Sequence, residues 1–362
     1  MFERLLRVLA SLRLTAICLA FALMLVLAGT LAQVNEGLYQ AQTRYFRSFV
    51  VWWSPANSGF QVPVLPGGYA VGSVLLVNLI VAHIQRFGVS RKRLGILMIH
   101  SGLVLLLLGQ LFTDILSRES TLRLKRGATS AYSESFSQCE LVLVDTNSPN
   151  FDKVVSVSQP RLARRGAIHD EQMPVTVRVK EFWPNARLFA SATNGAAPVS
   201  VSQGIGTNGL FLQKLPLATG TDERNTPAAI AELLTPSASL GTWLLSPVLR
   251  PQGFTLQGRT WEIMLRPKRH YTPYSLTLLD LRHDIYKGTD IPRNFSSRVR
   301  IQNPQTREDR EVLIYMNHPL RYRGETYYQH QMNKATDLSV LQVVRNPGWM
   351  TPYISCVMVG AG

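Results

Sequence analysis

The first third of the chain consists of long apolar stretches joined by short polar segments. Residues 14–32, 66–85 and 94–113 contain no Asp, Glu, Lys or Arg. At a rise of about 1.5 Å per residue, stretches of this length reach across a hydrocarbon layer of about 30 Å. The pattern therefore predicts an N-terminal membrane region, residues 1–113, with three transmembrane helices.

Beyond residue 113 the pattern changes to alternating and β-branched runs. Nine such runs occur between Cys139 and Gly348, each bounded by Gly, Pro, Asn or Asp. Residues 114–346 are therefore predicted to form a large β-rich domain, either a sandwich or an open barrel. Within it, residues 190–240 are rich in Ala, Ser, Thr and Gly, so we expect a long excursion with one short helix near Pro227 to Leu234.

A last apolar segment follows this domain. Pro347 and Trp349 are typical of the interfacial start of a helix, and about a dozen apolar residues follow where a span needs about 20. Residues 347–362 are expected to be the start of a truncated fourth transmembrane helix. The predicted fold class is membrane α combined with extracytoplasmic β.

The positive charges of the short loops predict the orientation. Three arginines lie within the first 13 residues, and four cations without an acid follow the second apolar stretch, whereas residues 33–65 hold two arginines and one glutamate. By the positive-inside rule the first two segments are cytoplasmic. We expect a multi-pass protein of the bacterial inner (cytoplasmic) membrane, with its N-terminus cytoplasmic and residues 114–346 periplasmic or extracytoplasmic. The first apolar stretch exceeds the usual signal-peptide core, which predicts an uncleaved helix.

Composition excludes several functional classes. The net charge of +15 is spread along the chain and no nucleic-acid motif accompanies it, so membrane topology and an anionic ligand or partner explain it better. The three cysteines form no CxxC motif, which argues against a disulfide framework or a thiol relay. The glycine loop at residues 204–209 lacks the lysine of a phosphate cradle. We expect no catalysis by this chain alone.

Two of the apolar stretches carry a histidine. His83 lies near the end of the second stretch and His100 lies inside the third. Ionisable groups inside spans are costly to desolvate, and imidazole is a common ligand of metals and haem iron. A hairpin at residues 87–93 would bring both within about two helical turns of the cytoplasmic face, at one depth. Each ring could instead be an interfacial or hydrogen-bonded packing residue. His100 is the stronger candidate because it lies deeper.

Small residues and cations surround this pair. Gly95 and Gly102 flank His100 and would permit close approach of a partner helix or a flat ligand. A haem would also need cations for its propionates. The candidates are Arg86, Arg91, Lys92 and Arg93. These cations also set the orientation of the protein in the membrane, and this topological role accounts for their presence without any ligand.

The histidines of the β-rich region form no HxxxH or HExxH pair, and we expect them to be exposed or hydrogen-bonded. They are His169, His270, His283, His318 and His330. In the segment MNHPLRYRGETYYQ, residues 316–329, Asn317, Pro319 and Gly324 are interpreted as turn formers, with Tyr327 and Tyr328 as strand packing residues.

Several segments are characteristic of one family. They are LASLRLTAICLAFALMLVLAGTLAQ, RLGILMIHSGLVLLLLGQLFTD with RESTLRLKRGATSAYSES, GTDIPRNFSSRVRIQNP, and EVLIYMNHPLRYRGETYYQHQ. Through them the chain resembles the ResB (CcsB) family of System II cytochrome c biogenesis proteins over nearly its whole length. The most specific segment is MNHPLRYRGETYYQ, which joins a turn to aromatic strand residues.

The resemblance implies a subunit that works with a ResC (CcsA) membrane partner, which carries a tryptophan-rich haem-handling segment. In that family the complex is thought to move haem across the membrane and attach it to apocytochrome c. The six tryptophans of this chain are scattered, so the attachment centre is expected on the partner and this chain is an accessory subunit. The resemblance points to His100 as an axial ligand of a b-type haem in transit, bound together with the partner.

Two other functional classes stay open. The chain could be a haem-free membrane scaffold or apocytochrome chaperone that stabilises the partner. A membrane-tethered sensor unrelated to cytochromes is also conceivable, although the segment MNHPLRYRGETYYQ argues against it.

Overall fold

The computed structural model describes residues 2–53, 60–86, 93–148, 151–218, 224–288, 292–333 and 335–362. The chain divides into two compact units. The first contains the residues up to Arg118 and those from Arg345 onward. The second contains Glu119–Ala218 and Arg224–Val344. Each unit has hydrophobic clusters of its own.

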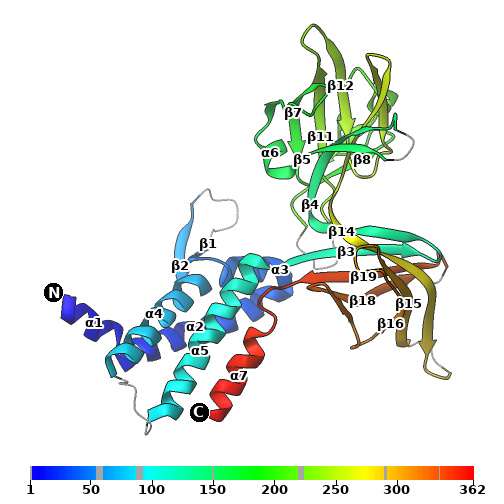
Figure 1. Cartoon of the computed structure of the whole chain (residues 1–362). Coiled ribbons are helices and arrows are strands. Elements are labelled where there is room, and N and C mark those ends of the chain that lie inside the picture. Colours follow the sequence, from blue (N-terminus) through cyan, green and yellow to red (C-terminus); the bar gives the residue numbers. More distant parts are fainter. Residues whose placement is uncertain are drawn as a thin grey trace. The chain divides into compact units, whose positions relative to one another are not determined.

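The first unit is mainly helical (Figure 1). Its elements are α1 (Phe2–Leu9), α2 (Leu12–Glu36), α3 (Leu38–Ala41), the π-helical turn η1 (Gln42–Phe46), the hairpin strands β1 (Val50–Trp53) and β2 (Val62–Pro66), α4 (Gly68–Arg86), α5 (Leu94–Leu116) and α7 (Thr351–Ala361). Helices α2, α4 and α5 are long and apolar enough to cross a membrane, which confirms the three predicted N-terminal helices. Residues 347–350 precede α7, and its extension into a full span stays a prediction.

Asn78 joins the start of the chain to α4. Its side chain is almost fully buried, and its amide nitrogen donates to the carbonyl oxygens of Leu9 at 2.5 Å and Ser11 at 3.2 Å. The hydroxyl of Thr15 donates to the Asn78 carbonyl oxygen at 2.7 Å. Carbonyls at a helix end lack intrahelical partners, and lipid cannot supply them. Asn78 of α4 therefore provides hydrogen bonds to the backbone carbonyls at the break between α1 and α2.

The second unit is built on a ten-stranded antiparallel sheet within the described residues. Eight strands follow the order β16-β15-β14-β4-β3-β19-β18-β17, with β13 paired to β14 and β5 paired to β4. Their bounds are β3 (Arg118–Lys125), β4 (Thr129–Asp145), β5 (Lys153–Ser158), β13 (Gln252–Leu256), β14 (Arg259–Ile285), β15 (Pro292–Asn303), β16 (Glu308–Tyr315), β17 (Leu320–Tyr322), β18 (Glu325–Asn333) and β19 (Leu338–Arg345). A bridge between Tyr315 and His318 brings the two ends of this order together, so the sheet is nearly closed into a barrel. The predicted β-rich domain is confirmed.

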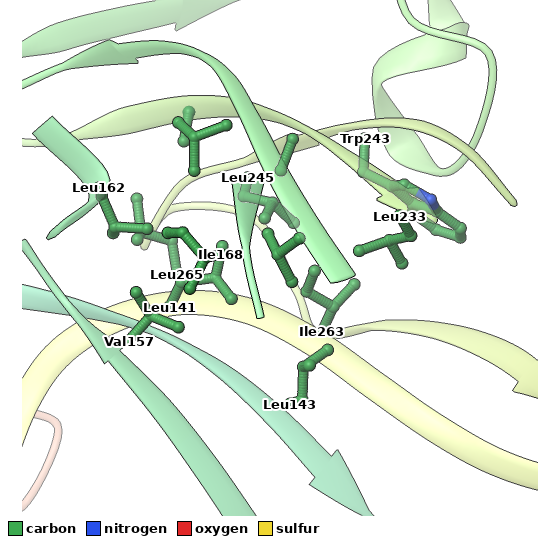
Figure 2. Close-up of a cluster of buried hydrophobic side chains, with 14 of the residues drawn as sticks. Leu141, Leu143, Val157, Leu162, Ile168, Leu233, Trp243, Leu245, Ile263 and Leu265 are labelled. Carbon is green, nitrogen blue, oxygen red and sulfur yellow. The ribbon is translucent and has the colours of Figure 1, made fainter. Parts of the chain in front are cut away.

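Strand β14 contributes to two separate cores. Its first half supplies Trp261, Ile263 and Leu265 to a cluster that includes Leu141 and Leu245. Figure 2 shows Ile263 and Leu265 among the side chains of this cluster, together with Leu141 and Leu245 from other strands. Its second half supplies further side chains to the core inside the barrel-like part, namely Tyr274, Leu276, Leu278 and Leu281. One strand of 27 residues therefore connects both cores.

Two smaller sheets complete the second unit: the four-stranded one contributes to the first core, and the three-stranded one contributes to a further cluster with Ala186 and Leu212. They have the orders β12-β11-β7-β6 and β8-β10-β9. Their elements, with two short helical turns, are α6 (Gln159–Ala163), β6 (Gly166–Ile168), β7 (Thr176–Trp183), β8 (Ala186–Phe189), β9 (Ala197–Pro198), η3 (Ile205–Asn208), β10 (Phe211–Lys214), β11 (Ala228–Leu234) and β12 (Ser239–Leu245).

The short helix expected near Pro227 to Leu234 is wrong. This segment is β11, a central strand between β7 and β12. Ala229, Ala231 and Leu233 alternate with less buried residues and are fully buried in the core. Pairing on both edges and burial of one face outweigh the intrinsic helix preference of alanine and leucine.

The glycine loop at residues 204–209 has a packing role. Gly204 has a φ of +71°, and a Cβ added there would lie 2.0 Å from Oε1 of Gln252 and 2.7 Å from the Trp243 ring. Oε1 of Gln252 also accepts from the backbone nitrogen of Ile205 at 2.8 Å. The loop is therefore fixed against β12 and β13 by a close backbone approach that glycine allows.

We expect Gly204→Ala to lower the free energy of unfolding of the second unit by about 3 kcal/mol, because backbone strain and overpacking add. Gly209→Ala is the matched control: its φ is +73°, but a Cβ there meets no atom within 4 Å, so only about 1 kcal/mol is expected. Denaturant unfolding of the purified chain, followed by tryptophan fluorescence, measures both. Equal losses for the two variants would contradict the close approach at Gly204.

Cys139 is a buried packing residue of the first core. Burial raises the pKa of its thiol to about 12, so at pH 8 only about one thiol in ten thousand is ionised. We expect no alkylation of Cys139 by iodoacetamide in the folded protein and rapid alkylation in denaturant. Peptide mass spectrometry measures the difference, and similar rates in both conditions would show that the thiol is accessible.

Candidate functional site: two histidines in the membrane-spanning unit

The two intramembrane histidines lie side by side. α4 and α5 are neighbours in the helical unit (Figure 1), and the ring centroids of His83 and His100 are 6.1 Å apart with an interplanar angle of 44°. Both side chains are half-buried. The structure thus brings together the two residues that the sequence predicted at one depth. Within the described residues, no group of three or more His, Cys, Asp or Glu side chains is placed to hold a metal ion.

A backbone contact orients His100. Its Nδ1 lies 2.8 Å from the carbonyl oxygen of Ile96, one turn earlier in α5. A carbonyl only accepts hydrogen bonds, so Nδ1 carries the proton and Nε2 carries the lone pair. Metal-binding histidines are commonly held in this way, with the second ring nitrogen donating to a carbonyl. The ring is therefore in the tautomer that can ligate iron through Nε2.

An apolar groove lies beside the pair. It has a volume of about 350 Å³, within the range of about 300–1,000 Å³ typical of small-molecule sites. His83 lines it together with side chains of α4, α5 and α7: Ile80, Ile84, Ser101, Val104, Leu105, Leu108 and Met358. The groove is open along one side, so a flat apolar ligand could lie in it and be covered by another protein. His100 is not among the lining residues.

The cations expected near the pair are only partly described. Arg86 is the last residue of α4, and Arg93 is exposed immediately before α5. Arg91 and Lys92 lie outside the described residues. A role of these four cations in holding propionates stays a prediction.

The glycines flanking His100 pack against the chain itself. A Cβ on Gly102 would lie 2.7 Å from Val359, and one on Gly95 would lie 2.5 Å from the backbone oxygen of Gly362. The hydroxyl of Ser355 donates to the Gly102 carbonyl at 2.5 Å. Glycine thus lets α7 approach α5 closely, which is a role of small residues in membrane helices. The face of α5 around Gly102, expected to admit a partner helix or flat ligand, is covered by α7.

The histidines of the second unit take varied positions. His169, His318 and His330 are exposed. His283 stacks on Phe295 with centroids 4.6 Å apart, and His318 stacks on Tyr315 at 4.2 Å. His270 is half-buried.

The segment at residues 316–329 forms a turn and a buried hydrogen-bond network. Asn317 and Gly324 have φ angles of 63° and 78°, as expected of turn formers. Glu325 accepts from the hydroxyls of Tyr327 at 2.8 Å and Tyr274 at 3.1 Å, and the two hydroxyls lie 2.8 Å apart. Burial raises the pKa of both phenols, which keeps them protonated as donors. This network stabilises the interior of the barrel-like part. The sequence predicted Tyr327 and Tyr328 only as packing residues of a strand, and the hydrogen bonds of Tyr327 were not predicted.

Two further polar groups of the helical unit escaped sequence reasoning. Besides Asn78, Asp114 joins three elements at the far end of α5: it forms an ion pair with Arg47 at 2.7 Å and accepts from the hydroxyl of Tyr69. Asp114 is the first charged residue after the uncharged stretch at residues 94–113. That position is the sequence signal that could have marked it as a residue that forms ion pairs or hydrogen bonds at the end of the span.

Comparison with known proteins finds a family that resembles part of the chain. Residues 257–351, which run from the start of β14 to the start of α7 and include the tyrosine–glutamate network, match the model of the ResB-like family. Protein NrfI of Wolinella succinogenes is 23% identical over 118 residues, which is 33% of this chain and 13% of the length of NrfI. The three apolar helices support a membrane protein.

Proposed function

We propose that this chain is the subunit of a System II cytochrome c biogenesis complex that helps to move haem across the membrane. A ResC (CcsA)-type partner then receives the haem and attaches it to apocytochrome c. The observation that carries the proposal is the pair of imidazoles of His83 and His100, 6.1 Å apart in the membrane-spanning unit. Ionisable groups at such positions generally serve a ligand or a pathway.

Each component of the site has a defined role. Nε2 of His100, presented by the bond from Nδ1 to Ile96, is the axial ligand of the haem iron. The apolar groove lined by His83 accommodates one edge of the porphyrin, and the partner covers the rest. Arg86, Arg91, Lys92 and Arg93 serve the propionates as the haem arrives. Haem is the cargo of this chain rather than a resident cofactor.

The charges of the loops support the direction of transfer. With its arginine-rich N-terminus and the cationic loop after α4 on the cytoplasmic side, the histidine pair faces the side on which haem is made. The second unit then lies outside, where it contacts the partner or apocytochrome c. The partner supplies the attachment chemistry.

Co-expression with a ResC-type partner tests the proposal. The complex is purified through a tag on this chain, and haem is quantified from the Soret band and the pyridine haemochrome. We expect non-covalent b-type haem to co-purify with the complex and matured cytochrome c to appear in the same cells. A complex that contains both proteins, supports maturation and carries no haem would reject the proposal.

One observation favours a second function. The family match at residues 257–351 lies almost wholly in the second unit and does not include the histidine pair. A haem-free scaffold, or a chaperone that holds apocytochrome c on the β-rich unit, would need that unit alone. The same purification, carried out with variants of the second unit, separates the two functions. For a scaffold or chaperone, we expect such variants to lose the partner or apocytochrome c from the purified complex, with no change in its haem content.

A further inference from the structure

Three arginines converge on one face of the large sheet in the second unit. Backbone register places Thr121 of β3 opposite Glu134 of β4, and Glu134 opposite Arg269 of β14. Arg123 lies two residues beyond Thr121, so its side chain emerges on the same face. Arg224 reaches this face from outside the sheet, where its guanidinium donates to the Thr121 hydroxyl at 2.9 Å.

Aromatic rings hold two of these guanidiniums in place. Arg224 lies over the ring of Phe136, 4.6 Å from its centroid, and Arg269 lies 4.1 Å from the centroid of Tyr132. Such stacking fixes the planar fork of arginine while leaving its N–H groups able to donate. The two charges are therefore preorganised.

Positive charge is in excess at this face. Glu134 lies 3.3 Å from Arg269, whereas no ion pair joins Arg123 to a described carboxylate. Burial, and then the neighbouring charge of Arg123, lower the pKa of Arg224, and the carboxylate of Glu134 acts in the opposite direction and offsets them only in part. Glu134 is therefore shared between Arg224 and Arg269, and the repulsion between Arg123 and Arg224 at a half-buried position favours the binding of a further anion.

We propose that Arg123, Arg224 and Arg269 form a binding site for the oxyanion of a small ligand, a carboxylate or a phosphate. Arginine is suited to both groups because its fork donates two parallel hydrogen bonds to their oxygens. A porphyrin carboxylate and a lipid phosphate are the two sources of such an anion at a membrane. The site is distinct from the histidine pair and does not depend on the proposed function.

The site differs from a purely structural cluster in one respect. Arg123 is exposed and adds little packing, so it contributes little to the stability of the fold. Removal of Arg123 should relieve repulsion at Arg224 and leave folding intact while weakening anion binding. Arg123→Gln therefore separates binding from stability.

Binding is measured on the full chain in detergent at low ionic strength, in a His100→Ala background that removes the proposed iron ligand. The probes are mesoporphyrin IX, its dimethyl ester, and inorganic phosphate, followed by fluorescence quenching or calorimetry. We expect the variant with both Arg123→Gln and Arg224→Gln to bind at least one anionic probe at least about tenfold more weakly. Arg123→Gln alone should weaken it several-fold with an unchanged unfolding midpoint. The matched control carries Arg282→Gln and Arg298→Gln, exposed arginines elsewhere on the same sheet.

The probes distinguish the source of the anion. Loss of mesoporphyrin binding, with the ester bound weakly by every variant, identifies a carboxylate ligand. Loss of phosphate binding identifies a phosphate-bearing ligand. Unchanged affinity of the double variant for both anions, or an equal loss in the control, would overturn the proposal without affecting the test of haem transfer.

Discussion

His100→Ala is expected to reduce the haem that co-purifies with the complex at least tenfold, the largest functional effect predicted for a single side chain. Loss of an outer-shell partner of a metal ligand already costs about 10- to 100-fold in affinity, and this substitution removes the ligand itself. His83→Ala should have a smaller effect, since its ring lines the groove beside His100 rather than supplying the favoured ligand. Soret absorbance per mole of complex measures both variants.

The control for this experiment is His330→Ala, which removes an exposed imidazole from the second unit. Its haem content should equal that of the unaltered complex. Quantifying the partner on the same gel excludes disassembly as the cause of haem loss. Equal haem in His100→Ala and in the unaltered complex would reject His100 as the iron ligand, and a larger loss in His83→Ala would transfer that role to His83.

Tyr327→Ala is expected to destabilise the second unit by about 4 kcal/mol, the largest structural effect predicted here. The side chain is 2% exposed, and deletion of a buried aromatic ring typically costs about 3–5 kcal/mol. Its hydroxyl also donates to Glu325. Tyr327→Phe, which removes only the hydroxyl, should cost about 2 kcal/mol because buried polar partners lose a bond.

Tyr328 provides the matched control, since it is the next residue in β18 and is 39% exposed. Tyr328→Phe should change the free energy of unfolding by less than about 0.5 kcal/mol. Denaturant unfolding monitored by tryptophan fluorescence compares the three variants. If Tyr327→Phe and Tyr328→Phe behave alike, the hydroxyl network does not contribute to the stability of the barrel-like part.

Much of the fold follows from local patterns. Uncharged stretches of about 20 residues predicted the three helices, and alternation predicted strands such as β5 and β7. β11 could not be predicted, because Ala229 and Ala231 favour a helix until two neighbouring strands pair with their backbone. The order of strands also depends on partners distant in sequence, as in the pairing of Arg269 with Glu134.

The candidate site was accessible to sequence reasoning for a simple geometric reason. A short loop between two helices places residues at similar distances from it at the same depth, which brings His83 to His100. The groove and the packing of α7 on Gly102 were not accessible, because both depend on a segment more than 240 residues further along the chain. The register that gathers Arg123, Arg224 and Arg269 was hidden for the same reason.

The length of β14 has a consequence for how the second unit folds. The first core needs side chains up to Leu265 and the second needs side chains up to Val343, so a growing chain cannot complete either core until most of β14, or nearly the whole unit, has been made. During that interval the strands already made present unpaired edges to proteases and to one another. Folding of the second unit should therefore depend on chaperones more than its final stability would suggest.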